Sequence, residues 1–123
     1  MRLIGVGVDI VDLKTFRKRL DAAMIDELFL PGEIEYCDSR ARPWESYAAR
    51  FAAKEAVFKA LGAGLSQGMG WKCVEILREV SGRVTVELSG AVLDRARTMG
   101  VGRMEISISH TRDNAIAIAT ASG

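Results

Sequence analysis

The chain is short of the residues on which several common kinds of site depend. Its 123 amino acids include two cysteines and one histidine, and its net charge is only +1. Cys37 and Cys73 lack both the spacing of metal ligands and a nearby histidine cluster, so we expect reduced thiols and no disulfide framework. No apolar run approaches the roughly 20 residues that span a bilayer. With 27% charged residues of balanced sign, the chain has no global attraction for nucleic acid or membranes, and neither partner is expected.

Nothing in the sequence divides the chain or directs it out of the cell. It has no internal repeat, low-complexity tract or long linker, and its length suits one domain. Residues 1–123 are therefore predicted to form a single domain. The first residues run directly into a predicted strand, without the basic and apolar regions of a secretory signal, so a cytoplasmic protein is expected.

A helix predicted over residues 45–61 carries charge beside its apolar side. At about 100° per residue, Tyr47, Phe51 and Phe58 fall within a narrow arc that should face the core. Glu55 and Lys59 follow at the margin of that arc, where a partly desolvated charge needs a partner, a metal or a ligand. Two interpretations remain open, which are an ordinary salt bridge between these two side chains and the wall of a functional site.

The first predicted strand, residues 3–10, places two glycines and a carboxylate on one face. Alternation puts Gly5, Gly7 and Asp9 together, opposite four aliphatic residues. Paired strand glycines indicate the close approach of a ligand or of another backbone, so a packed helix and a binding site are both compatible with them. The chain has neither the third glycine of a dinucleotide-binding motif nor the Gly-Lys-Ser/Thr of a P-loop, which disfavours both nucleotide folds.

The remaining pattern predicts an α+β fold, a mainly antiparallel sheet that carries the long helix. Asp12 should cap a helix that starts at Leu13 and continues into the twenties, and Pro31-Gly32 should break the chain. Gly62 opens a glycine-rich segment that is a candidate ligand loop. The other predicted elements are a short helix at 33–37, a hairpin of strands 74–80 and 84–88, a helix at 89–99, and a second hairpin of strands 104–110 and 115–120.

Four segments in this order resemble the small bacterial 4′-phosphopantetheinyl transferases of the holo-acyl-carrier-protein synthase type. They read GVGVDIVDL at 5–13, FLPGEIEYC at 29–37, RFAAKEAVFKALGAG at 50–64 and SISHT at 107–111. The resemblance covers essentially the whole chain. It implies Mg²⁺-dependent transfer of 4′-phosphopantetheine from coenzyme A to a serine of apo acyl carrier protein, with release of 3′,5′-ADP. It also implies a homotrimer with coenzyme A bound in clefts between subunits.

The resemblance assigns roles to charged residues of the strand and the long helix. Asp9 and Glu55 match the two acidic positions of the family and are expected to hold Mg²⁺, a metal that takes oxygen ligands. Lys59 matches the second lysine of the family pattern and should stabilise charge on the pyrophosphate. Lys54 and Arg50 are weaker candidates for phosphate contacts, and for Arg50 a solvated helix residue is at least as good an interpretation.

His110, the only histidine, has two interpretations. It is in phase with Ile106 and Ile108 on the predicted strand, which is compatible with a structural histidine at a strand end. Its match to the family's S-x-S-H ending favours a position near coenzyme A, as a phosphate contact or as an aid to proton movement. Both of these roles stay open.

The first predicted helix should recognise the carrier protein. Lys14, Arg17 and Lys18 span about 100° of the helix opposite its apolar side, and acyl carrier proteins are acidic. A solvated surface is the alternative. Two rival functions also remain: a Mg²⁺-dependent phosphohydrolase, which would release phosphopantetheine to water, and a non-catalytic module that binds the carrier without modifying it.

Overall fold

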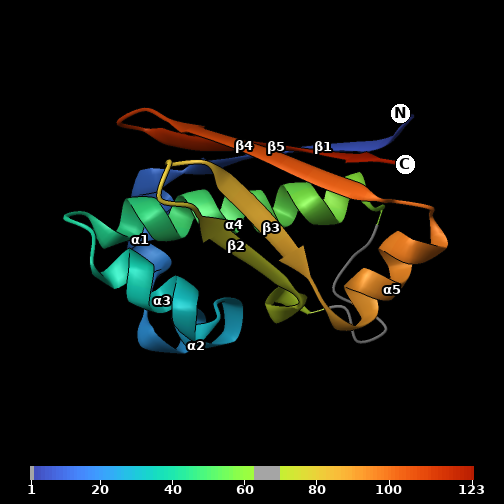
Figure 1. Cartoon of the computed structure of the whole chain (residues 1–123). Helices are drawn as coiled ribbons and strands as arrows, with labels where there is room; N and C mark the ends of the chain where they lie inside the picture. The colour runs from blue at the N-terminus through green and yellow to red at the C-terminus, as the bar shows by residue number, and fades with distance from the viewer. Residues whose placement is uncertain (1, 63–69) are drawn as a thin grey trace.

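The structure is a computed structural model that describes residues 2–62 and 70–123. A three-stranded antiparallel sheet of order β1-β5-β4 lies on one side of helix α4, and a separate hairpin, β2-β3, lies against the other side with β3 beside β4 (Figure 1). The prediction of an α+β fold with antiparallel strands is confirmed. The elements are β1 (Leu3–Asp12), α1 (Leu13–Arg19), α2 (Ala22–Leu28), α3 (Pro31–Asp38), α4 (Pro43–Ala60), the 3₁₀ turn η1 (Trp71–Cys73), β2 (Val74–Arg78), β3 (Val84–Leu88), α5 (Gly90–Thr98), β4 (Arg103–His110) and β5 (Asn114–Ser122).

The backbone of α4 lies directly against β1. A Cβ atom added at Gly5 would lie 1.9 Å from the carbonyl oxygen of Ala60, and one added at Gly7 would lie 1.9 Å from that of Ala56. No side chain fits at either position. Of the two interpretations of the strand glycines, the packed helix is the one that the structure adopts. The inner face of β5 contributes only small buried side chains to this contact, Ala115, Ala117, Ala119 and Ala121.

The opposite face of the sheet is apolar and uncovered in the single chain. Val6, Val8 and Ile10 of β1 expose 51%, 52% and 63% of their surface, and Ile116 and Ile118 of β5 are exposed beside them. Apolar side chains that cluster on one outer face of a protein commonly mark an interface.

The N-terminal helices differ from the prediction in where they begin and end. Asp12 caps α1 as expected, since its Oδ1 atom accepts a hydrogen bond of 3.0 Å from the Thr15 amide. The helix does not continue into the twenties, however, because it ends at Arg19 and Asp21 caps a second helix by accepting from the Met24 amide at 2.8 Å. The chain does not break at Pro31 either. It starts α3, where its missing N–H costs nothing.

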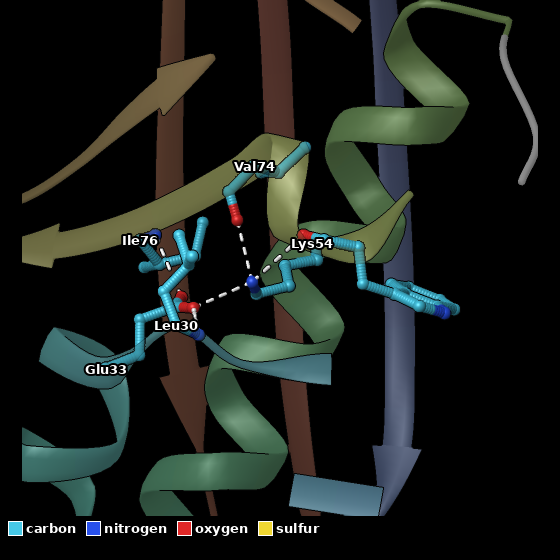
Figure 2. A network of polar contacts seen from close by, with 6 residues as sticks. Leu30, Glu33, Lys54, Val74 and Ile76 are labelled. Atoms are coloured by element: carbon cyan, nitrogen blue, oxygen red, sulfur yellow. Dashed lines mark hydrogen bonds and ion pairs between the residues drawn. The ribbon is translucent and has the colours of Figure 1, made fainter. Parts of the chain in front are cut away.

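A buried ion pair connects four elements, α3, α4, η1 and β2, on the side of α4 away from β1. The Lys54 ammonium donates to Glu33 Oε1 at 2.8 Å and to the carbonyl oxygens of Val74 at 2.7 Å and Trp71 at 3.1 Å (Figure 2). Glu33 also accepts from the amides of Leu30 at 2.9 Å and Ile76 at 3.0 Å. Both side chains are fully buried, so each charge depends on the other for compensation.

The expectation that Lys54 contacts phosphate is therefore corrected. All three N–H donors of its ammonium are used inside the protein, and the side chain has no exposed surface. Burial lowers the pKa of Lys54, and the Glu33 carboxylate counteracts this effect. The role of Lys54 is to hold α4 against α3 and β2.

We expect Glu33→Gln to lower the free energy of unfolding by about 3–5 kcal/mol, because it leaves the Lys54 ammonium buried without its counter-charge. Urea denaturation measures the change. Glu35→Gln, on the exposed part of the same helix, is the matched control and should stay within about 0.5 kcal/mol of the wild type. A Glu33 variant as stable as this control would show that the pair does not hold these elements together.

Candidate functional site

The acidic residues expected to bind metal lie in one groove. Asp9 lies on the same face of β1 as Gly7, and Glu55 lies on the helix that packs there. Both line a groove of about 380 Å³, which we call the acidic groove. Its other lining residues are Ile10, Val11, Asp12, Thr15, Phe16, Arg19, Met24 and Phe51.

Lys59 belongs to the same cluster but not through the expected helix salt bridge. Its ammonium donates to Asp9 Oδ1 at 3.0 Å and to the Val8 carbonyl oxygen at 3.1 Å. Among residues 2–62 and 70–123, no ion pair joins Lys59 to Glu55. The Glu55–Lys59 bridge is thus replaced by a contact between helix and strand, which brings residues 50 positions apart into one site.

The Asp9 carboxylate disfavours the charged form of Glu55. Burial raises the pKa of Glu55, the Asp9 carboxylate raises it further, and the Lys59 ammonium acts in the opposite direction. No hydrogen bond or ion pair holds the Glu55 carboxylate within the described part of the chain. A cation between the two carboxylates would relieve this repulsion.

The carboxylates of Asp9 and Glu55 suit Mg²⁺ better than a metal ion whose ligands must all come from the protein. The described residues contain no cluster of three or more Asp, Glu, His or Cys side chains around a common point. Mg²⁺ keeps several waters and is usually held by one or two carboxylates together with substrate phosphates. Asp9 and Glu55 supply two carboxylates in an open groove, which is the protein's share of such a site.

A second depression is lined by several positively charged side chains. This cleft of about 630 Å³, here called the arginine cleft, contains Arg50 and His110, both expected near phosphate. It also contains Arg40, Arg42 and Arg78, which the sequence analysis did not select, with Glu45 as its acidic member. The Arg40-Ala41-Arg42 sequence directly before α4 was the signal for two of them.

Arg50 is buried, so its interpretation as a solvated helix residue is wrong. Only 6% of its surface is exposed, and its guanidinium lies 4.2 Å from the centre of the Tyr36 ring. Its Nε atom finds no hydrogen-bond partner among the described residues. A buried guanidinium N–H without an acceptor carries an energetic cost.

The acidic groove and the arginine cleft lie on different sides of α4. Arg50 and Glu55 are five residues apart, which corresponds to about 140° around the helix. The two depressions have no lining residue in common. The structure therefore does not bring Arg50 and His110 together with Asp9 and Glu55 within one chain.

The basic residues of α1 face a third depression. Lys14, Arg17 and Lys18 line a shallow hollow of about 450 Å³ together with Trp44 and Arg112, and we call it the basic hollow. The Arg17 guanidinium stacks over Trp44, 3.6 Å from the ring centre, which fixes the side chain. Arg112, from the turn between β4 and β5, was not predicted because strand pairing rather than sequence distance brings it there.

The expected ligand loop is only partly within the described residues. Gly62 follows the C-terminus of α4 with φ of +59°, a conformation that favours glycine and ends helices. Its carbonyl oxygen lies 3.4 Å from Arg95 Nη2. Residues 63–69 lie outside the described part of the chain.

Across the described residues, no helix is long and apolar enough to cross a bilayer.

The fold and sequence match those of known proteins. The model of the 4′-phosphopantetheinyl transferase superfamily matches residues 5–119. The holo-[acyl-carrier-protein] synthase of Geobacter sulfurreducens is 40% identical over 120 residues, which cover 95% of this chain and 94% of that protein. That of Desulforudis audaxviator is 43% identical over 124 residues, with 98% and 94% covered.

Solved structures agree with this match. The holo-[acyl-carrier-protein] synthase of Neisseria meningitidis has a TM-score of 0.88 at 27% identity, with 98% of this chain and 99% of that chain covered. The Helicobacter pylori synthase in complex with coenzyme A has a TM-score of 0.82 at 27% identity, with 95% and 99% covered. Because the family model spans most of the chain and both kinds of relative agree with it, the chain belongs to the 4′-phosphopantetheinyl transferase superfamily.

Proposed function

We propose that this chain transfers 4′-phosphopantetheine from coenzyme A to a serine of apo acyl carrier protein and releases 3′,5′-ADP. The observation that carries the proposal is that Asp9 and Glu55 line one groove and that Lys59 binds the Asp9 carboxylate, in a chain of this family. We also propose a cytoplasmic location for this chain.

In this reaction the serine hydroxyl oxygen forms a bond to the pantetheine-side phosphorus of the pyrophosphate. The bond from that phosphorus to the bridging oxygen breaks, 3′,5′-ADP leaves, and the serine loses its proton. Asp9 and Glu55 would hold Mg²⁺, which when bound neutralises charge on the pyrophosphate oxygens. Lys59 is exposed enough to turn from Asp9 to the phosphates and stabilise the leaving group.

The arginine cleft supplies the contacts proposed for the rest of coenzyme A. Arg50 and the exposed His110 line a cleft with three further arginines, a setting that suits a phosphorylated nucleoside. Gly62 lies one turn beyond Lys59, close enough in sequence for its backbone to border the phosphates, and we keep it as a proposed contact. Lys54 is left out because its donors are occupied.

A homotrimer would unite the two depressions. Because the acidic groove and the arginine cleft lie on opposite flanks of one chain, a coenzyme A molecule between neighbouring subunits could use the groove of one and the cleft of the next. The uncovered apolar face of Val6, Val8 and Ile10 supplies surface that assembly would bury. Sedimentation equilibrium tests the assembly, and a stable monomer would contradict it.

The carrier protein is proposed to dock on α1. Lys14, Arg17, Lys18 and Arg112 surround the basic hollow, and no acidic side chain is among the described residues that line it. A concentrated positive surface suits an acidic protein and accelerates its encounter.

Mass spectrometry of apo carrier protein, incubated with the enzyme, coenzyme A and Mg²⁺, tests the function directly. We expect the carrier to gain the mass of one phosphopantetheine group. Release of phosphopantetheine to water without carrier would favour the phosphohydrolase. A carrier that binds but gains no mass would favour the non-catalytic binding module.

We expect Asp9→Ala and Glu55→Ala each to reduce turnover by about 100-fold or more, since each removes one of two carboxylates proposed for the metal. Both residues lie at an open groove rather than in the core, so the unfolding temperature should change little. Asp94→Ala, on the exposed side of α5, is the control and should retain wild-type turnover. Near-normal transfer by either groove variant at limiting Mg²⁺ would remove that residue from the metal site.

Arg17→Glu should lower kcat/KM for the carrier about 10-fold at low salt, because it replaces attraction by repulsion at the basic hollow. The defect should shrink as salt screens the charges. Steady-state kinetics over an ionic-strength series measures the effect, and a titration with coenzyme A should give unchanged affinity. A defect independent of salt would argue against electrostatic docking at this residue.

A further inference from the structure

Helix α3 packs against α4 through a series of side-chain pairs. In order along α3, the pairs are Glu33 with Lys54, Tyr36 with Arg50, and Asp38 with Tyr47. Residue numbers rise along α3 while they fall along α4, so the two helices run antiparallel where they meet. The first and last pairs are polar contacts of 2.8 Å and 2.7 Å between heavy atoms. The middle pair differs from them because both of its members line the arginine cleft.

Arg50 is a buried cation without an ion-pair partner in the part of the chain that the structure describes. Only 6% of its surface is exposed. Glu45, the acidic residue of the cleft, pairs with Arg42 at 3.6 Å instead. Burial raises the pKa of the nearby Cys37 thiol to about 11, against the effect of Arg50, so at neutral pH this thiol carries no compensating charge. A buried charge in this position depends on another favourable contact.

The Tyr36 ring supplies such a contact. The Arg50 guanidinium carbon lies 4.2 Å from the ring centre. A cation over an aromatic ring within about 6 Å of its centre is attracted by the negative face of the ring, and more strongly where water is excluded. This attraction comes from the ring itself and does not need the tyrosine hydroxyl.

The same ring contacts a second arginine of the cleft. The Arg40 guanidinium carbon lies 5.5 Å from the centre of the Tyr36 ring. Arg40 follows the end of α3, where the Ser39 hydroxyl donates to the Tyr36 carbonyl oxygen at 2.6 Å. Two cations beside one ring repel each other, and the attraction of each to the ring offsets part of that repulsion. An uncharged side chain thus stabilises two positive charges at the cleft.

We propose that Tyr36 is a positioning residue that orders the guanidinium groups of Arg50 and Arg40 before coenzyme A enters the arginine cleft. The inference rests on the proposed function, in which this cleft binds the nucleotide part of coenzyme A. Binding groups that are already ordered lose less conformational freedom when the ligand arrives, so the ring strengthens binding without touching the reacting atoms. Its loss should therefore change the affinity for coenzyme A and not the rate of the chemical step.

The experiment compares Tyr36→Leu, which removes the ring, with Tyr36→Phe, which keeps it. Isothermal titration calorimetry gives the affinity for 3′,5′-ADP, and steady-state kinetics with carrier in excess gives kcat and KM for coenzyme A. We expect Tyr36→Leu to weaken 3′,5′-ADP binding and raise KM about 10-fold, with kcat within about threefold of the wild type. Tyr36→Phe should stay within about twofold of the wild type in each quantity, because a phenyl ring also attracts a cation.

Tyr47→Phe is the matched control, because it changes the adjacent pair of the same helix contact. It removes the hydroxyl that donates to Asp38, and Tyr47 is not among the residues that line the cleft. This variant should lower the unfolding temperature and keep the wild-type affinity for 3′,5′-ADP. It separates looser packing of α3 from loss of the Tyr36 ring.

A double-mutant cycle tests whether Tyr36 acts through Arg50. In an Arg50→Gln background, Tyr36→Leu should weaken 3′,5′-ADP binding by no more than about threefold, because the guanidinium that the ring orders is already absent.

The inference is overturned if Tyr36→Leu, or the wild type itself, shows that the ring has no part in binding: unchanged affinity in the variant, or no affinity for 3′,5′-ADP in the wild type. A Tyr36→Phe variant as weak as Tyr36→Leu would mean that the hydroxyl contacts the ligand. An equal defect in Tyr47→Phe would assign the effect to helix packing, and an undiminished effect in the Arg50→Gln background would show that Tyr36 acts independently of Arg50. Failure of the proposed function would be seen separately, as wild-type protein that leaves apo carrier unmodified, and the titration decides the inference in either case.

Discussion

The contact between the backbones of α4 and β1 is the constraint on which the site depends. Gly5 and Gly7 allow the helix to lie so close to the strand that no side chain fits between them. Asp9 is the next residue on that face of β1, and at this distance the Lys59 ammonium reaches its carboxylate. A larger separation of helix and strand would leave Glu55 and Asp9 in different places, so the metal pair proposed here is a product of glycine packing.

Helix α4, fixed in this position, carries charged residues on two of its sides. One side places Glu55 in the acidic groove and Lys59 against the Asp9 carboxylate, and the other places Lys54 in the buried pair with Glu33 and Arg50 in the arginine cleft. The ion pair stabilises the position of α3 and β2 relative to α4 (Figure 2). Four charged residues within ten positions of α4 thus lie in three different environments. Their degree of burial determines which of them can bind a ligand.

The separation of the charged surfaces is the reason for proposing that the reaction uses more than one chain. The groove, the cleft and the hollow have separate linings around α1 and α4. A substrate with phosphates at both ends of a nucleotide and an acidic protein partner would need all three. In the proposed homotrimer, the exposed apolar face of the sheet would be buried between subunits, and a neighbouring subunit would supply the depression that one chain keeps apart.

The sequence by itself determined the element types, the Asp12 cap, the common face of Gly5, Gly7 and Asp9, and, through its motifs, the family, because periodicity, capping and motifs are local properties of the chain. Only the tertiary structure decided what each charged group meets. It buried Lys54, paired Lys59 with Asp9 instead of Glu55, and separated Arg19 from Arg17. These outcomes depend on contacts between residues far apart in the sequence, and a helical wheel contains no information about which element packs against each side.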